Sequence, residues 1–137
     1  METFRIVIVD DHTLVRQGLR RIIGEMADLE VIGEAGDGLE LLKLLEKITP
    51  HMILLDISMP NLRGNEAIRE IKALHPEVKI LILTMHKEKE YLYQAISAGA
   101  NGYFLKEDAN AEILSAVEKI RRGGVYISPL LPEVDNF

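Results

Sequence analysis

Short apolar runs alternate along the chain with longer stretches in which apolar residues recur every three or four positions. The short runs have the length of buried strands, and the periodic stretches have the spacing of helices that pack one face on a sheet. This alternation is typical of a parallel sheet covered by helices. The expected strands are residues 4–9, 30–34, 52–55, 79–83 and 102–105.

The first periodic stretch shows the helical pattern clearly. Val15, Leu19, Ile22 and Met26 follow one another at intervals of four, three and four residues, which places them on one side of a helix. Similar stripes follow each of the other four strands. Five strand–helix pairs joined by right-handed crossovers predict an α/β fold, (βα)5, with a doubly wound parallel five-stranded sheet in a single domain.

The end of the chain does not continue this pattern. Residues 125–137 contain two prolines and lack helical or strand periodicity. Such a segment is typical of a linker or a frayed terminus. We therefore expect one domain over residues 1–124 and a linker stub or C-terminal tail over residues 125–137.

The composition is that of a globular protein with a sizeable core, since 47% of the 137 residues are apolar and 28% are charged. A net charge of −6 repels nucleic-acid phosphates and anionic lipid surfaces. The absence of cysteine excludes disulfides and thiolate metal sites. No apolar run approaches the ~20 residues that span a bilayer. The start also lacks the basic segment of a secretion signal, so we expect a cytoplasmic protein without membrane contact.

Polar residues follow four of the expected strands. Asp10 and Asp11 come after the first strand, Asp56 after the third, Thr84 at the end of the fourth and Lys106 after the fifth. In an open parallel sheet the carboxyl ends of the strands form the ligand site. An isolated Asp-Asp pair is more simply explained as the polar start of a helix. With three further polar residues at the same edge, the pattern favours a site.

Three clustered carboxylates need a compensating charge. Two carboxylates about 4 Å apart repel by roughly 4 kcal/mol at an effective dielectric near 20. Lys106 and a divalent cation would balance the three, and a set of oxygen ligands without thiolate favours Mg²⁺. A carboxylate beside Mg²⁺, a lysine and a hydroxyl is equipped to attack phosphorus, with an aspartyl phosphate as the product.

These residues carry a family resemblance. The acidic pair, Asp56, Thr84 and Lys106 stand in the order found in receiver domains of bacterial two-component response regulators. Residues 56–64 resemble the family's acceptor loop, D-x-x-M-P-x-x-x-G, and residues 10–19 and 123–129 resemble the NarL/FixJ-like subfamily. The resemblance covers roughly residues 4–124. It implies the flavodoxin-like strand order 2-1-3-4-5 for the receiver domain.

The resemblance assigns a role to each matching position. It implies that Asp56 is the phosphoacceptor and that Asp10 and Asp11, with Asp56 and the backbone carbonyl of Ser58, hold Mg²⁺. Lys106 matches the lysine that contacts the phosphoryl group.

Two further positions match the family's switch residues. Thr84 corresponds to the hydroxyl that moves toward the phosphate, and Tyr103 to the aromatic that rotates inward on phosphorylation. An acyl phosphate adds charge and acceptor oxygens, which bias such a two-state element. A half-buried strand aromatic is the simpler explanation of Tyr103, and its spacing to Lys106 favours the switch.

The implied partners are a histidine kinase, DNA through a C-terminal helix-turn-helix domain absent from this chain, and a second copy of the chain on phosphorylation. The function is then signalling, not enzymatic, although the domain takes part in its own phosphorylation and dephosphorylation. One alternative is a stand-alone receiver or phosphorelay protein acting by protein contacts.

Other classes fit the residues less well. An Asp-nucleophile phosphohydrolase would carry a second carboxylate two residues after Asp56, where this chain has Ser58. A flavin carrier would need a phosphate cradle after the first strand, where Asp10 and Asp11 would repel phosphate.

Three features near the site leave alternatives open. Glu107 replaces the proline that many receivers have after the lysine. Because Glu107 is not proline, a cis Lys106–Glu107 peptide bond would cost ~2.5–4 kcal/mol, and whether the chain keeps that bend is open. Arg16 and Arg20 share one helical face and form either a kinase-docking patch or a solvated surface. His12 is expected at the polar rim of the site, more readily than as a metal ligand.

Overall fold

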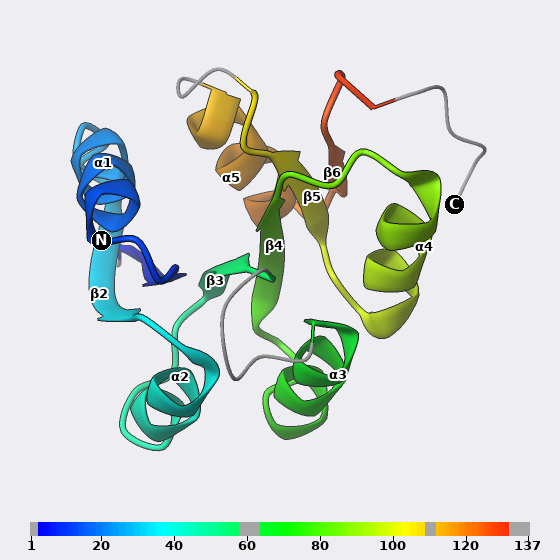
Figure 1. Cartoon of the computed structure of the whole chain (residues 1–137). Coiled ribbons are helices and arrows are strands. Elements are labelled where there is room, and N and C mark those ends of the chain that lie inside the picture. The colour runs from blue at the N-terminus through cyan, green and yellow to red at the C-terminus, as the bar shows by residue number, and fades with distance from the viewer. Residues whose placement is uncertain (1–2, 58–63, 109–111, 132–137) are drawn as a thin grey trace.

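A computed structural model describes residues 3–57, 64–108 and 112–131, in which parallel strands and helices alternate (Figure 1). The strands are β1 (Phe4–Val9), β2 (Leu29–Ala35), β3 (Met52–Asp56), β4 (Lys79–Thr84), β5 (Gly102–Leu105) and β6 (Tyr126–Ile127). The helices are α1 (Thr13–Ile23), α2 (Gly38–Leu45), α3 (Gly64–Leu74), α4 (Lys89–Ala98) and α5 (Glu112–Arg121). Among the described residues no helix has the length and apolar character needed to cross a bilayer.

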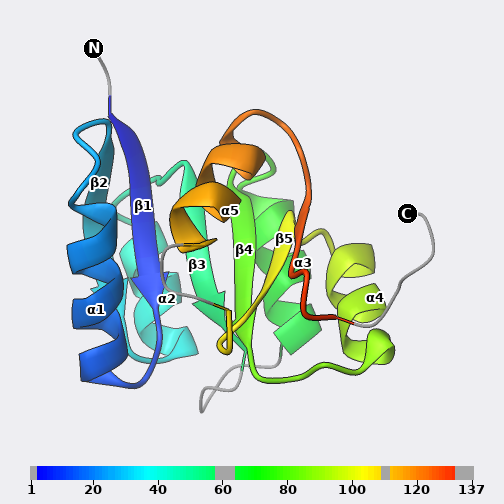
Figure 2. The same cartoon turned by 90° about the horizontal axis from the view of Figure 1, so that it is seen from above.

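The sheet lies between two layers of helices. Its strand order is β2-β1-β3-β4-β5-β6, and every pairing is parallel. Helices α2, α3 and α4 pack on one face and α1 and α5 on the other, as both views show (Figure 2). The predicted α/β class and the order 2-1-3-4-5 are confirmed.

Both faces of the central strands are buried, which explains their continuous apolar sequence. Ile53 and Leu55 of β3 point into the cluster beneath α2, α3 and α4. Met52 and Leu54 point into the cluster beneath α1 and α5. A strand enclosed in this way is held rigidly, so the residue that follows it, or ends it, is presented at a defined place.

The sheet has one strand more than expected. Residues 126–127, which fall in the predicted linker or tail, pair with β5, with Gly102 opposite Tyr126 and Tyr103 opposite Ile127. A Cβ at Gly102 would come within 2.7 Å of the ends of the Ile120 and Leu81 side chains on α5 and β4, so a larger residue there would force these side chains to move. Two residues are too few to show a strand's alternation of apolar and polar positions, so the hydrophobic pattern of the sequence did not predict β6.

Candidate functional site

The carboxyl ends of β1, β3, β4 and β5 meet at one edge of the sheet. Register places Val9 beside Leu55, Asp56 beside Leu83 and Thr84 beside Leu105. Asp10 and Lys106 directly follow β1 and β5, whereas Asp56 and Thr84 are the last residues of β3 and β4. Four residues that are far apart in the sequence therefore converge, as expected, because parallel strands present their ends together.

Two buried carboxylates share one lysine at this edge. The side chains of Asp10 and Asp56 are 0% and 1% exposed, and that of Lys106 is 24% exposed. Lys106 Nζ donates to Asp56 Oδ2 at 3.0 Å and to Asp10 Oδ2 at 3.3 Å. A charge pair at this depth is retained only when its partners are well placed, because removing both from water is costly.

The ammonium of Lys106 responds to two opposing influences. Burial favours the neutral amine, but the hydrogen bond to Asp56 and the negative charges of Asp56 and Asp10 favour the ammonium and raise its pKa above the usual 10.5. Lys106 is therefore a permanent cation at physiological pH.

A wider acidic cluster surrounds this pair. Potential ligand atoms of Asp10, Asp11, His12 and Asp56 all lie within 4.8 Å of one another. Three of these residues are carboxylates, and Lys106 bonds to only two of them in the described contacts. Oxygen donors in this arrangement, with an excess of negative charge, suit a hard divalent cation. The expected ligand Ser58 lies outside the described residues.

His12 lies at the rim of the cluster, as predicted. Its side chain is 68% exposed, and Nδ1 lies 2.9 Å from Asp11 Oδ1 and 3.2 Å from Asp10 Oδ1. Its backbone N–H also donates to Asp10 Oδ1 at 2.9 Å. These contacts orient the Asp10 carboxylate from the side opposite to Lys106.

Thr84 and Tyr103 meet at the backbone of His86. The buried Thr84 Oγ1 accepts from the backbone N–H of His86 at 3.1 Å, and the Tyr103 hydroxyl donates to the His86 carbonyl at 2.9 Å. Burial raises the pKa of Tyr103 to about 12, so it stays a neutral donor. The His86 ring stacks on Tyr91 with centroids 4.2 Å apart.

Arg16 has a structural role that its sequence position did not reveal. Its side chain is 19% exposed, and Nε lies 3.2 Å from Glu34 Oε1 on β2. Its guanidinium also donates to the backbone carbonyl of Asp10. Arg20 contacts the same Glu34 but remains half-exposed. Arg16 thus faces the interior side of α1 and ties the Asp10 turn to β2.

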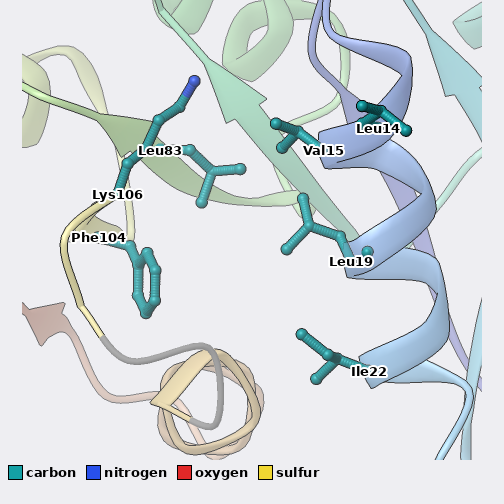
Figure 3. A pocket seen from close by; sticks show the side chains of 8 residues that line it. Leu14, Val15, Leu19, Ile22, Leu83, Phe104 and Lys106 are labelled. Atoms are coloured by element: carbon teal, nitrogen blue, oxygen red, sulfur yellow. The ribbon is translucent and has the colours of Figure 1, made fainter.

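An apolar groove lies between α1 and the ends of β4 and β5, next to Lys106 (Figure 3). Its volume is about 330 Å³, and Leu14, Val15 and Leu19 of α1 form one wall, with Phe104 on the opposite side. Leu14 is 81% exposed. An apolar side chain so open to solvent beside a charged site is suited to contact with another protein.

The turn after β5 has ordinary backbone geometry. The described residues contain no cis peptide bond, so the Lys106–Glu107 bond is trans. Glu107, found where many receivers have proline, instead pairs with Lys87 across 2.8 Å. The next acidic residue, Asp108, is buried and accepts hydrogen bonds from Leu105 N and Ser128 Oγ.

Comparison with known proteins agrees with this architecture. The family model for the response regulator receiver domain matches residues 6–118. The transcriptional regulatory protein DegU of Brevibacillus brevis is 42% identical over 91% of this chain and 53% of its own length. The chain thus spans about half of that relative.

Solved structures are similar over nearly the whole chain. A two-component response regulator of the LuxR family from Aurantimonas sp. SI85-9A1 has a TM-score of 0.87 at 38% identity, over 93% of this chain and 91% of that one. The isolated REC domain of RcsB from Salmonella enterica serovar Typhimurium, determined with phosphomimetic BeF3-, has a TM-score of 0.86 at 26% identity, over 93% and 95% of the two chains.

Proposed function

The chain belongs to the response regulator receiver-domain family, and from this premise we propose that Asp56 accepts a phosphoryl group from a histidine kinase. One observation carries the proposal. Asp56 is a nearly inaccessible carboxylate at a strand end, and it is paired to Lys106 across 3.0 Å within an acidic cluster. A buried charged group of this kind at a ligand-binding edge is typical of a functional site.

Two side chains at the edge of the sheet, those of Asp56 and Lys106, act directly in the transfer. An oxygen of the Asp56 carboxylate forms a bond to phosphorus while the bond between phosphorus and the donor's imidazole nitrogen breaks. The leaving nitrogen keeps the bonding electron pair, and the imidazole departs neutral because its other ring nitrogen carries a proton in the donor. Lys106, already within hydrogen-bond distance of Asp56, offsets the negative charge on the phosphoryl oxygens.

The donor set also fits Mg²⁺, with Asp10, Asp11 and Asp56 as the described side chains that would hold it. Bound there, Mg²⁺ supplies the positive charge that lets an anionic phosphate approach three carboxylates. Without such a cation, Lys106 alone would face the combined charge of the carboxylates and the phosphate. The backbone carbonyl of Ser58 is the further ligand that the family resemblance implies.

Phosphorylation is read out through Thr84 and Tyr103. Both residues bond to the backbone of His86, so movement of the Thr84 hydroxyl toward a phosphate at Asp56 breaks one bond to the loop that also holds Tyr103. A two-state element needs this kind of shared contact, because the two residues then change together. The signal would reach the surface near α4, which begins at Lys89.

The groove beside α1 is where the kinase docks. Leu14 and Val15 are open to solvent, and Lys106 lies at the end of the same groove, next to Asp56 (Figure 3). A helix carrying the phosphohistidine would bury these apolar side chains against itself while its imidazole reaches Asp56. The contact would exclude water from the transfer, which favours phosphoryl transfer over hydrolysis.

The wider protein is a cytoplasmic transcriptional regulator that pairs on phosphorylation. DegU, a transcriptional regulatory protein, is about twice as long as the stretch that matches this chain. DNA binding would belong to a helix-turn-helix domain beyond Phe137, since this chain carries a net charge of −6. A stand-alone receiver is the alternative, and the gene sequence after Phe137 separates the two.

The test is phosphorylation by a small acyl phosphate. With Mg²⁺ present, the purified chain should gain one alkali-labile phosphoryl group, measured as the intact mass before and after mild base. Chelation of divalent cations should abolish the gain, because uncompensated carboxylates repel the donor. An adduct that forms equally well in chelator, or none in Mg²⁺, would contradict the proposal.

A further inference from the structure

Two buried polar residues form a pair outside the acidic cluster. Asp108 and Ser128 are 6% and 3% exposed, and Ser128 Oγ donates to Asp108 Oδ1 at 2.7 Å. Ser128 follows β6 and lies beyond residues 6–118, which the family model matches. Buried polar groups are usually hydrogen-bonded, but a pair joining a chain end to a loop twenty residues earlier fixes two segments at once.

Asp108 shapes the turn that carries Lys106. Its Oδ2 accepts from the backbone N–H of Leu105 at 3.1 Å, and its own backbone N–H donates to the Leu105 carbonyl at 2.8 Å. Lys106 lies inside this doubly closed turn, and its N–H donates to the Thr84 carbonyl at 2.8 Å. The Asp108 carboxylate therefore determines the direction in which the backbone leaves β5. This direction sets the position of the Lys106 backbone, from which its side chain extends toward Asp56.

Ser128 is itself held by the sheet. Its N–H donates to the Tyr103 carbonyl at 3.0 Å, and its Oγ accepts from Leu130 N at 3.2 Å. In the bond from Leu130 N, the Ser128 oxygen acts as an acceptor, so the hydroxyl proton is free to point to Asp108. A hydroxyl with one fixed donor direction is well suited to orient a carboxylate.

We propose that Ser128, acting through Asp108, is a positioning residue for Lys106. The inference rests on the proposed function, in which Lys106 contacts the phosphoryl group at Asp56. The bonds run from Ser128 to Asp108, from Asp108 to the turn, and from Lys106 to Asp56. Energetic coupling acts in both directions, so a phosphoryl group that draws Lys106 inward also affects how firmly the segment after β6 is held.

Apolar packing alone offers a different explanation for the docked segment. Tyr126 packs on Phe104 with ring centroids 5.9 Å apart, and Leu131 packs against the core that contains Tyr103. If packing alone held the segment, loss of the Ser128 hydroxyl would leave the Lys106 turn unchanged. The two explanations therefore differ in what happens at Leu105 and Lys106.

The experiment compares Ser128→Ala and Ser128→Cys with Ser115→Ala, which removes an exposed hydroxyl on α5. Hydrogen exchange at the Leu105 amide should be about tenfold faster in both Ser128 variants, because the carboxylate that accepts its hydrogen is no longer oriented. Phosphorylation by a small acyl phosphate at saturating Mg²⁺ should be about three- to tenfold slower, the factor expected for one lost hydrogen bond. Ser115→Ala should match wild type.

Measuring Mg²⁺ affinity distinguishes a specific effect on the position of Lys106 from a general distortion of the acidic site. Titration calorimetry should give Mg²⁺ affinities within about twofold of wild type in the Ser128 variants, since the carboxylate ligands keep their own contacts. Asp108→Asn should also slow phosphorylation, and Ser128→Ala added to it should slow it no further, because both changes interrupt one path.

Each outcome has a definite meaning. Unchanged Leu105 exchange in both Ser128 variants, or phosphorylation rates equal to that of Ser115→Ala, would overturn the inference. Weaker Mg²⁺ binding in the same proportion as the rate would also overturn it, because the effect would then not be specific to Lys106. A wild-type chain that takes no phosphoryl group would refute the proposed function, while Leu105 exchange would still decide whether Ser128 holds the turn.

Discussion

Asp56→Asn is expected to leave the chain unable to take a phosphoryl group and, in metal-free solution, to raise its free energy of unfolding by about 1–2 kcal/mol. The amide cannot serve as the nucleophile. It also removes a charge that is buried among other carboxylates within 4.8 Å. The lost attraction to Lys106 is smaller than the combined repulsion and desolvation that disappear, and Asp10 still pairs with Lys106 at 3.3 Å.

Thermal and urea unfolding in the presence of a chelator measure the stability change. The matched control is Glu77→Gln, which neutralises an exposed acidic residue before β4 and should shift stability by less than about 0.5 kcal/mol. Saturating Mg²⁺ should narrow the gap between Asp56→Asn and wild type, because the cation relieves the same repulsion in wild type. A less stable Asp56→Asn in chelator would show that the Asp56–Lys106 attraction outweighs the crowding of carboxylates.

Lys106→Met is expected to destabilise the metal-free chain by about 2–3 kcal/mol at neutral pH. Methionine keeps much of the apolar stem but removes the cation that bonds to Asp10 and Asp56. The expected destabilisation is smaller than for a fully buried pair, because the Lys106 side chain is 24% exposed and solvent screens part of its interaction with Asp10 and Asp56. Urea unfolding measures the difference, and Lys47→Met on the exposed surface after α2 is the control.

The pH dependence of this difference has a definite sign. The pKa of Lys106 is raised in the folded chain above 10.5, its value in the unfolded chain. Its contribution is therefore fully present below pH 10.5 and is lost as pH rises through the folded pKa. Wild type and Lys106→Met should differ by a constant amount near neutrality and converge in strong alkali. A difference that grows above pH 10.5 would contradict the pairing.

The strands and the polar residues at their ends could both be predicted from the burial of the strands on two faces. Strands buried on two faces are continuously apolar, so the residue at which each run ends is easily found. Asp56 ends such a run, and parallel pairing brings it to the same edge as Asp10 and Lys106. No side-chain geometry was needed to expect that these three residues meet.

Contacts made across the fold by single side chains could not be predicted in this way. Arg16 was expected on an exposed face because it lies four residues before Arg20 on the same side of the helix, yet it donates to the Asp10 carbonyl. Ser128 lies in a segment without periodicity, and no sequence pattern links it to its partner Asp108. Such pairings depend on where separate loops come together, which local sequence does not encode.

The switch residues lie between these cases. The family resemblance, together with its spacing to Lys106, suggested Tyr103, and the structure places it fully buried, with its hydroxyl on the His86 carbonyl. The part played by the His86 backbone had no signal in the sequence, since any residue can supply an N–H and a carbonyl. The inward movement of Tyr103 on phosphorylation stays a prediction.

The central claim is that Asp56 carries the phosphoryl group, and chemical trapping at that residue tests it most directly. Borohydride reduces an acyl phosphate of aspartate to homoserine, which peptide mass spectrometry locates. After treatment with a small acyl phosphate and Mg²⁺, the account predicts homoserine at position 56 and at no other aspartate. Homoserine at Asp10 or Asp11 with Asp56 unmodified, or a phosphate stable to mild base, would contradict it.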